Sequence, residues 1–182
     1  MTPGQLAAAR ERTLADVIGP DLRVLFCGIN PGLMSAWTGY HFARPGNRFW
    51  PALHASGFTA RRFAPAEQGR MPELGLGITN VAGRATARAD ELTAAELRAG
   101  GQLLSAKVTA YRPRWLAVLG VTAYRVAFDD RAARVGPQER TVGDTRIWVL
   151  PSPSGLNAHW SPAALGAEFG RLREAVQELP AS

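Results

Sequence analysis

Three short segments carry side chains whose types and spacing are suited to chemistry. Residues 28–33 (GINPGL) place the amide Asn30 in a turn rich in glycine and proline. Residues 83–90 (GRATARAD) combine arginines with a carboxylate, and residues 151–157 (PSPSGLN) carry the apolar Leu156 in a stretch of Pro, Ser and Gly. An amide can both donate to and accept from a water molecule, so Asn30 is a candidate for orienting one.

The residues around Asn30 suggest what the water would attack. Ser35, Tyr40 and Phe42 follow Asn30 within a dozen residues, so a hydroxyl and aromatic rings accompany the amide. A glycine-rich turn alone would be weak evidence, because it serves equally well as a tight turn or a phosphate cradle. The combined set is suited to a base extruded from DNA, with aromatics to stack on it and Leu156 to fill the gap.

The elements that must position these segments follow an alternating pattern. Four short apolar segments, rich in β-branched and aromatic residues, are typical of strands covered on both faces. They are residues 22–27, 76–82, 115–119 and 146–150. Helical patterns cover residues 3–18, 47–56, 93–110, 121–128 and 162–179. The alternation predicts an α/β protein whose parallel sheet has helices on both faces.

Two helix starts carry a local signal. Thr93 with Glu96 three residues later is a capping box, and Ser161 before Pro162 fits an N-cap followed by proline. We find no repeat, low-complexity tract or linker, so a single domain over residues 1–182 is expected. Its N-terminal helix falls within residues 1–20, and residues 180–182 form a frayed tail.

Composition excludes several classes of protein. Hydrophobic residues make up 46% and charged residues 20% of the 182 residues, which is too apolar for a disordered chain. The longest apolar runs, residues 24–29 and 115–121, fall short of the ~18 that a membrane-spanning helix needs. The first residues contain no secretory signal. We therefore expect a cytoplasmic protein with no membrane partner.

The net charge and the few residues able to bind metals limit the partners and cofactors that we expect. The formal net charge of +6 favours a polyanion, although the use of Arg for all cations but Lys107 could also reflect genome base composition. A single cysteine, Cys27, and three widely spaced histidines do not make a metal or cluster site. We expect no metal and no cofactor.

Ligands of open parallel sheets bind beyond the carboxyl ends of the strands, where the three segments above would meet. Sorting the acidic residues by this rule leaves Asp90 and its neighbour Glu91 on a loop at that edge. Asp90 is therefore an auxiliary catalytic candidate. It would otherwise be a solvated residue ahead of a helix, favoured there by the helix dipole.

Three motifs carry a resemblance to a known family. They are FCGINPGL (residues 26–33), PGNRFW (45–50) and WVLPSPSGL (148–156). With them the chain resembles, over residues 22–179, the mismatch-specific uracil-DNA glycosylases, in the thymine-DNA glycosylase branch of the uracil-DNA glycosylase superfamily. The resemblance implies a three-layer α/β/α sandwich with a central four-stranded, mainly parallel sheet. It also implies hydrolysis of the bond between a damaged base and deoxyribose, which starts base-excision repair.

Site roles carry over position by position as implications of the resemblance. Asn30 corresponds to the residue that places the attacking water, and Phe42 to the aromatic side chain that stacks on the flipped base. Ile29 and Ser35 would shape the base pocket. Ser152 would also contact the substrate, and it stands where this branch more often has Asn. Asn30 could instead be only a turn residue, and Phe42 only a core residue.

The wedge and the DNA contacts carry over in the same way. Gly155 and Leu156 correspond to the wedge that enters the duplex, and Asn157 to a partner of the widowed guanine. Position 158, where a wedge Arg can occur, is Ala. Leu156 could instead be an ordinary loop residue tucked under the fold. Arg84 and Arg88 are candidates for phosphate contacts, unless they are simply solvated arginines.

The sequence therefore predicts a monofunctional DNA glycosylase. Its substrate would be uracil paired with guanine in double-stranded DNA, with single-stranded DNA a further substrate and thymine a poorer base. Lys107, the only lysine, lies in a predicted helix at the far edge of the sheet from the site, which argues against Schiff-base chemistry. We expect a monomer. The rival interpretations are a non-catalytic nucleic-acid-binding module of the same fold and a nucleotide-binding enzyme, although neither phosphate-loop motif is present.

Overall fold

A five-stranded sheet forms the centre of the protein in the computed structural model, which describes residues 1–178. The strand order is β2-β1-β3-β5-β4, and β1, β2, β3 and β5 run parallel. The strands are β1 (Val24–Gly28), β2 (Leu76–Asn80), β3 (Trp115–Leu119), β4 (Gly136–Val142) and β5 (Thr145–Leu150). The α/β class predicted from the sequence is confirmed.

The expected count of four strands is wrong, because β4 adds a fifth. This strand pairs antiparallel with β5 through a turn at Gly143, whose φ of 56° lies in the left-handed region. Its sequence, GPQERTV, contains a proline and charged residues and is mostly exposed. An edge strand with one exposed face needs no continuous apolar run, so the pattern used for the buried strands does not detect it.

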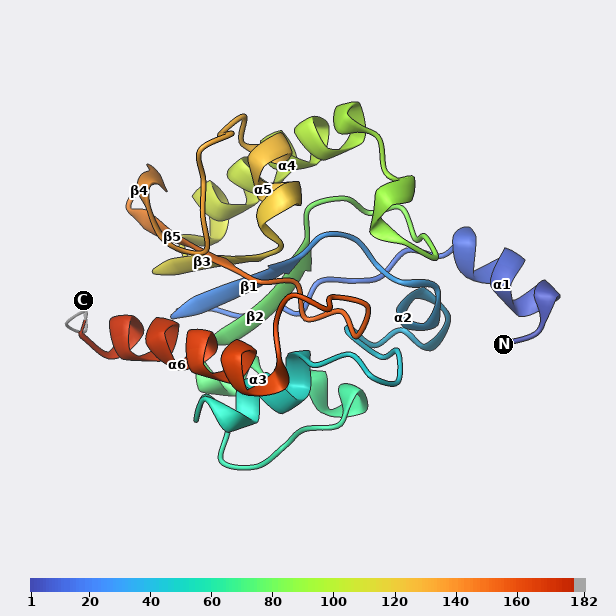
Figure 1. Ribbon diagram of the computed structural model, residues 1–182, viewed down its shortest axis with the longest axis horizontal. Coiled ribbons are helices and arrows are strands. Elements are labelled where there is room, and N and C mark those ends of the chain that lie inside the picture. The colour runs from blue at the N-terminus through green and yellow to red at the C-terminus, as the bar shows by residue number, and fades with distance from the viewer. Residues whose placement is uncertain (179–182) are drawn as a thin grey trace.

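Helices cover both faces of the sheet, as Figure 1 shows. On one face lie α4 (Ala94–Tyr111) and α5 (Val121–Ala127), and on the other α3 (Phe49–Ala55) and α6 (Pro162–Glu178). The capping box at Thr93 is present, since its hydroxyl accepts from the Glu96 backbone and the Glu96 carboxylate accepts in return. The predicted helix end at position 179 and the tail at 180–182 lie outside the described residues.

The N-terminal region differs most from expectation. Helix α1 (Pro3–Arg10) ends eight residues before the predicted boundary at residue 18. The chain then runs extended, and Val17 pairs with Ile78 of β2 by two backbone hydrogen bonds. A further helix, α2 (Leu33–Thr38), and three short 3-10 helices, Pro65–Arg70, Pro72–Leu74 and Ala89–Glu91, were not expected.

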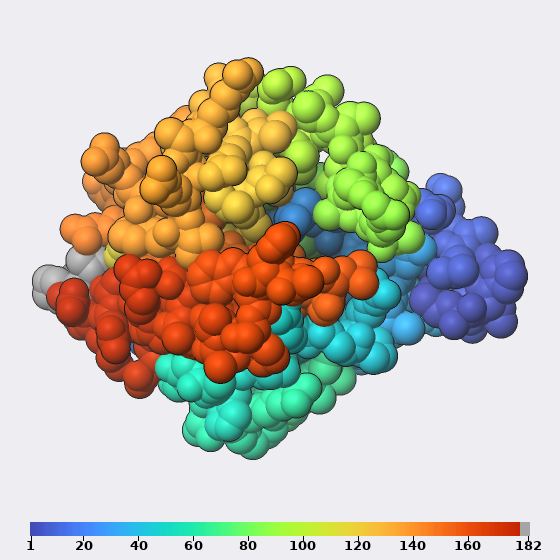
Figure 2. Space-filling model, in the orientation of Figure 1, coloured from blue at the N-terminus to red at the C-terminus, as the bar shows by residue number. Residues whose placement is uncertain are grey.

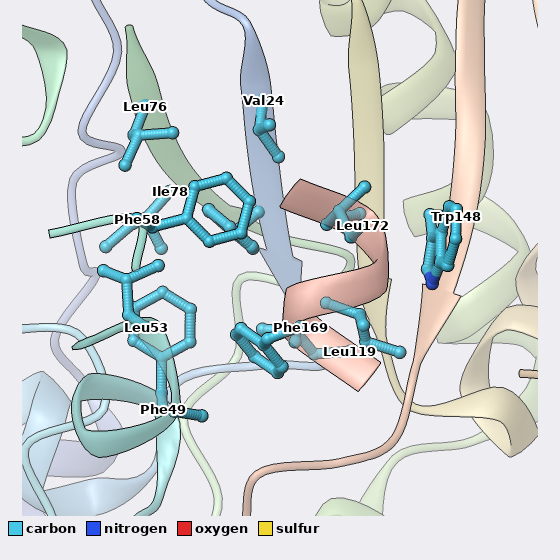
Figure 3. Close-up of a cluster of buried hydrophobic side chains, with 14 of the residues drawn as sticks. Val24, Phe49, Leu53, Phe58, Leu76, Ile78, Leu119, Trp148, Phe169 and Leu172 are labelled. Atoms are coloured by element: carbon cyan, nitrogen blue, oxygen red, sulfur yellow. The ribbon is translucent and has the colours of Figure 1, made fainter. Parts of the chain in front are cut away.

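Two apolar layers sandwich the sheet. The layer under α3 and α6 is aromatic, and Figure 3 shows Phe49, Phe58 and Phe169 in it. The Phe26 ring lies edge-on to Phe49 and Phe58 at 5.4 and 5.5 Å and is stacked on Phe169 at 5.9 Å. Burying each such ring contributes about 1.5–3 kcal/mol. Because β1 carries Phe26 two residues before the 28–33 turn, this layer fixes the start of the candidate site.

The structure also bears on membranes and metals. None of the helices in residues 1–178 is long and apolar enough to cross a membrane. Within the same residues, no cluster of three or more His, Cys, Asp or Glu side chains forms a candidate metal site. Burial raises the pKa of the Cys27 thiol, so this cysteine is a protonated core residue.

Candidate active site

A cavity of about 580 Å³ lies beyond the carboxyl ends of the parallel strands. Its walls come mainly from residues 28–32, from four residues of the 41–47 segment, from residues 86–90, and from residues 152–157 except Gly155. Figure 2 shows a hollow between the orange segment after β5 and the light-green segment before α4. The three segments predicted to meet at this edge of the sheet therefore line one cavity.

Asn30 is held by its amide nitrogen. Nδ2 donates to the Arg84 carbonyl at 2.8 Å and to the Thr86 hydroxyl at 2.7 Å, with the Pro31 carbonyl at 3.3 Å. A carbonyl oxygen can only accept, so the nitrogen and not the oxygen must face Arg84. The amide oxygen Oδ1 points away from these acceptors, and it is the atom that Asn30 can offer to a water molecule in the cavity.

Thr86 fixes this orientation from the other side. Its hydroxyl donates to the Arg88 carbonyl at 2.7 Å, so the hydroxyl oxygen must accept from Asn30. The backbone reinforces the contact, because Gly32 and Thr86 form a parallel bridge and the Thr86 N–H donates to the Pro31 carbonyl. The turn after β1 and the segment after β2 are therefore joined along their length, and Asn30 has little freedom to rotate.

The residues predicted to shape a base pocket are brought together. Ile29, Ser35, Phe42 and Ser152 all line the cavity. The Phe42 ring stacks on the core residue Phe49 with centroids 4.1 Å apart, and its backbone adopts a φ of 53°, which is uncommon for an aromatic residue. One face of the ring is thus packed on the core while Phe42 still lines the cavity, and its stacking on a flipped base stays a prediction.

Several cavity residues had no role in the sequence analysis, among them Leu14, His41, Asn80 and Thr86. His41 is buried, and its Nε2 donates to the Ala15 carbonyl at 2.8 Å, which leaves Nδ1 as an acceptor 3.5 Å from Asn80 Nδ2. Burial lowers the pKa of His41, in keeping with a neutral ring. Asn80 ends β2 at the same sheet edge as Asn30, a signal that could have found it.

The segment after β5 presents Leu156 to solvent. Leu156 is 66% exposed at the cavity mouth, so it is not tucked under the fold. Gly155 lies outside the cavity lining, and a side chain there would bring Cβ within 2.7 Å of the Gly46 carbonyl oxygen. Asn157 lines the cavity, with its Nδ2 donating to the Ser152 carbonyl at 3.0 Å. The apolar side chain thus projects from a segment with little room to move.

The two predicted phosphate contacts are placed differently. Arg84 does not line the cavity; its guanidinium pairs with Glu96 at 2.6 Å and donates to the Glu91 carbonyl. The hydrogen bond from Arg84 is the main reason that the pKa of Glu96 falls to about 2. Arg88 lines the cavity and is exposed, so it is the better placed of the two for a phosphate.

Asp90 lies at the cavity rim in the 3-10 helix Ala89–Glu91. Its side chain is 62% exposed and pairs with Arg88 two residues away. Exposed ion pairs contribute little and leave their partners free to rearrange. Asp90 therefore reaches the cavity, but without the hydrogen-bond network that surrounds Asn30.

The prediction that Lys107 lies at the far edge of the sheet from the site is wrong. Its ammonium pairs with Asp16 and donates to the Thr79 hydroxyl at 2.9 Å, near the carboxyl end of β2. Successive strand residues point to opposite faces, so Thr79 points toward α4 while Asn80 lines the cavity. Lys107 is therefore separated from the site because it lies on the other face of the sheet, and not because it lies at the opposite end of the strands.

Comparison with known proteins bears on the family and the fold. The family description "Uracil DNA glycosylase superfamily" matches residues 15–179. A protein from Methanosarcina acetivorans, assigned as a uracil DNA glycosylase and solved by solution NMR, has a similar fold with a TM-score of 0.59. The two chains are 19% identical over 90% of this chain and 98% of the other.

The α/β sheet with its cavity beyond the strand ends defines a ligand-binding α/β protein, and the family match covers nearly the whole chain. The protein belongs to the uracil DNA glycosylase superfamily. It is accordingly a DNA glycosylase, an enzyme that hydrolyses N-glycosidic bonds in DNA.

Proposed function

We propose that this protein is a monofunctional glycosylase that removes uracil mispaired with guanine from double-stranded DNA. The observation that carries the proposal is the locked amide of Asn30 inside a cavity whose mouth holds the exposed Leu156. A water-orienting group and a wedge side by side are what a base-flipping hydrolase needs. A binding module would have no use for a locked water-orienting amide.

In the proposed reaction, uracil leaves the stack and its ring lies against Phe42. Water held by Asn30 Oδ1 adds its oxygen to C1′ of deoxyribose as the bond from C1′ to N1 breaks. The bonding electrons leave with the base, so uracil departs as an anion. The attacking water releases its proton to bulk solvent, and the uracil anion takes up a proton from solvent. The sugar passes through an oxocarbenium-like state. An amide cannot take up the proton, so catalysis depends on position and electrostatics.

Charge in the cavity supports the departing anion. Arg44 and Arg88 both line the cavity, and the chain as a whole carries a net charge of +6. Positive charge near the base stabilises the negative charge that develops on it, and Arg44 contributes more than Arg88, whose charge is offset by Asp90. Bases that leave readily are favoured, so thymine is a poorer substrate, since its methyl group weakens the leaving group and crowds the pocket.

The wedge and its neighbours account for the duplex substrate. Leu156 enters the stack where the base has left, Gly155 allows the close approach of the backbone, and Asn157 faces the unpaired guanine. Filling the gap offsets the cost of unstacking, which is a few kcal/mol. Arg88 binds a flanking phosphate and Ser152 contacts the extruded nucleotide.

Monofunctional hydrolysis is proposed because the amine of Lys107 is held by Asp16 and Thr79 on the opposite face of the sheet. Strand cleavage by a glycosylase commonly requires an amine that forms a Schiff base with the sugar. The product is an intact strand with an abasic site, which breaks only on treatment with alkali or heat.

The test uses oligonucleotides with uracil opposite guanine, uracil opposite adenine, uracil in a single strand and thymine opposite guanine. We expect the fastest release of uracil opposite guanine, a slower release of thymine, and no strand breaks before alkali. Equal rates on the guanine and adenine duplexes would remove the mismatch specificity. Borohydride trapping of a covalent adduct would contradict monofunctional hydrolysis.

A further inference from the structure

Among the described residues, Arg48 makes several hydrogen bonds to the segment after β5, residues 151–160. The guanidinium of Arg48 donates to the carbonyls of Ser154 at 2.9 Å and Asn157 at 2.8 Å, and also to the carbonyl of Trp160. The Arg48 backbone N–H donates to the Pro153 carbonyl at 2.9 Å. One residue thus satisfies four carbonyls on both sides of Leu156.

Arginine is the side chain that this arrangement requires. Three carbonyls spread over seven residues accept from the two terminal nitrogens of one planar fork, whereas a lysine ammonium is a single point on a flexible stem. The third nitrogen, Nε, is buried and has no hydrogen-bond partner among the described residues. A buried unpaired donor is unfavourable, so the contacts to the segment outweigh that cost.

Arg48 is itself anchored in the core. It is the N-cap of α3, whose next residues, Phe49 and Trp50, are buried in the aromatic layer. Its neighbour Gly46 touches Gly155 so closely that a Cβ on Gly155 would lie 2.7 Å from the Gly46 carbonyl oxygen. The segment that presents Leu156 therefore rests on residues 46–48, which are continuous with the core.

We propose that Arg48 is a positioning residue that sets the height and direction of Leu156 at the cavity mouth. It acts through the carbonyls of Ser154 and Asn157, which flank the Gly155-Leu156 tip, and it contacts neither the extruded base nor the water. This inference rests on the proposed function, because it assumes that Leu156 enters the duplex. It predicts that loss of Arg48 damages duplex substrates and spares single-stranded ones.

The experiment measures single-turnover uracil release by Arg48→Lys, Leu156→Ala and the double variant, on duplex and single-stranded substrates. We expect Arg48→Lys to lose about tenfold on the guanine–uracil duplex and less than about twofold on the single strand, the scale of one displaced contact. The double variant should be no slower than Leu156→Ala alone, because both changes remove the same wedge. Arg98→Lys, at an exposed position on α4, is the matched control and should behave as wild type.

Hydrogen exchange separates positioning from general loss of stability. In Arg48→Lys, the backbone amides of Leu156 and Asn157 should exchange faster, while those of β1 keep their wild-type rates. Equal losses on duplex and single strand, multiplying losses in the double variant, or faster exchange throughout β1 would each overturn the positioning role.

The failure of the proposed function gives a different pattern. If the wild-type protein releases no uracil from any oligonucleotide, the proposed function is wrong, and the positioning role of Arg48 is wrong as well. If wild type is active but Leu156→Ala loses no more on duplex than on single strand, the wedge is wrong. If Leu156→Ala is selective for duplex but Arg48→Lys matches wild type, only the role of Arg48 is wrong.

Discussion

The inner wall and the rim of the cavity are built in different ways. The inner wall consists of Asn30, His41, Asn80 and Thr86, and the rim of Arg88, Asp90 and Leu156. His41 and Thr86 are buried, and the inner-wall side chains are hydrogen-bonded to one another or to backbone carbonyls. The rim side chains are exposed, and Asp90 pairs only with its near neighbour Arg88 among its described ion pairs.

The difference indicates a division of labour between chemistry and DNA binding. A group that orients a water must be fixed before the substrate arrives, because any freedom it loses on binding raises the barrier. A group that meets DNA can adjust to the duplex. We therefore propose that the amide of Asn30, and not the carboxylate of Asp90, is the group prepared for catalysis. Substitutions in the two regions should therefore differ in effect, from a large loss at Asn30 to almost none at Asp90.

Removing the amide of Asn30 should cause the largest loss. Asn30→Ala deletes the oxygen that accepts from water, so single-turnover uracil release should slow by about 10²-fold or more, the usual scale for a positioned catalytic group. Binding to the guanine–uracil duplex should persist, because the rim is intact. A parallel measurement of affinity by fluorescence anisotropy provides the control. A rate within about threefold of wild type would contradict the proposed difference between the inner wall and the rim.

Loosening the amide should cost less than removing it. Thr86→Val keeps the shape of the side chain but removes the oxygen that accepts from Asn30 Nδ2 at 2.7 Å. The Arg84 carbonyl still holds Nδ2, so we expect a loss of about tenfold, equivalent to about 1.4 kcal/mol. Thr86→Ser retains the hydroxyl and should stay near wild type. If both variants lose equally, volume and not hydrogen bonding explains the effect.

The neutral ring of His41 should make stability depend on pH. Burial lowers its pKa below the ordinary 6.5, so below pH 6.5 the unfolded chain binds a proton more readily than the folded protein. The free energy of unfolding should fall as the pH drops from 7 toward the lowered pKa, by at most about 1.4 kcal/mol per pH unit.

Denaturant melts at several pH values check this contribution. His41→Gln should be less stable at pH 7 but should lose most of the pH dependence. His159→Gln, at an exposed position after the wedge, should keep the wild-type slope. An unchanged slope in His41→Gln would mean that the inner wall does not hold a neutral ring.

Neutralising Asp90 should have the smallest effect. Asp90→Asn removes the charge from an exposed side chain whose partner is Arg88, so the single-turnover rate should change by less than about twofold. A loss of rate comparable to that of Asn30→Ala would mean that the rim takes part in the chemistry. The division between a catalytic inner wall and a DNA-binding rim would then be wrong.

The sequence was sufficient for features that depend on local patterns. Continuous apolar runs located β1, β2, β3 and β5, and the Thr93 capping box marked the start of α4 within one residue. The sheet-edge rule brought Asn30, Asp90 and Leu156 to one cavity, because parallel strands end at a common edge.

Features that depend on contacts between distant segments were not predictable in the same way. Helix α1 ends early because the following chain pairs with β2 at Ile78, which no local pattern encodes. His41 owes its neutral state to burial, which lowers its pKa against the opposing effect of the hydrogen bond to the Ala15 carbonyl, and Arg48 owes its proposed role to carbonyls more than 100 positions later. Every residue has a backbone carbonyl, so the sequence does not show which carbonyls accept from a given side chain. Such partners can be identified only in the folded structure.

The orientation of Asn30 toward water is the central claim, and a structure of the protein with DNA tests it most directly. The substrate would carry 2′-fluoro-2′-deoxyuridine opposite guanine, since fluorine at C2′ destabilises the oxocarbenium-like state and slows cleavage. We predict a water about 3 Å from Asn30 Oδ1 and facing C1′ of the extruded nucleotide. A water at C1′ held instead by the Asp90 carboxylate, with Asn30 making no contact to it, would contradict the account.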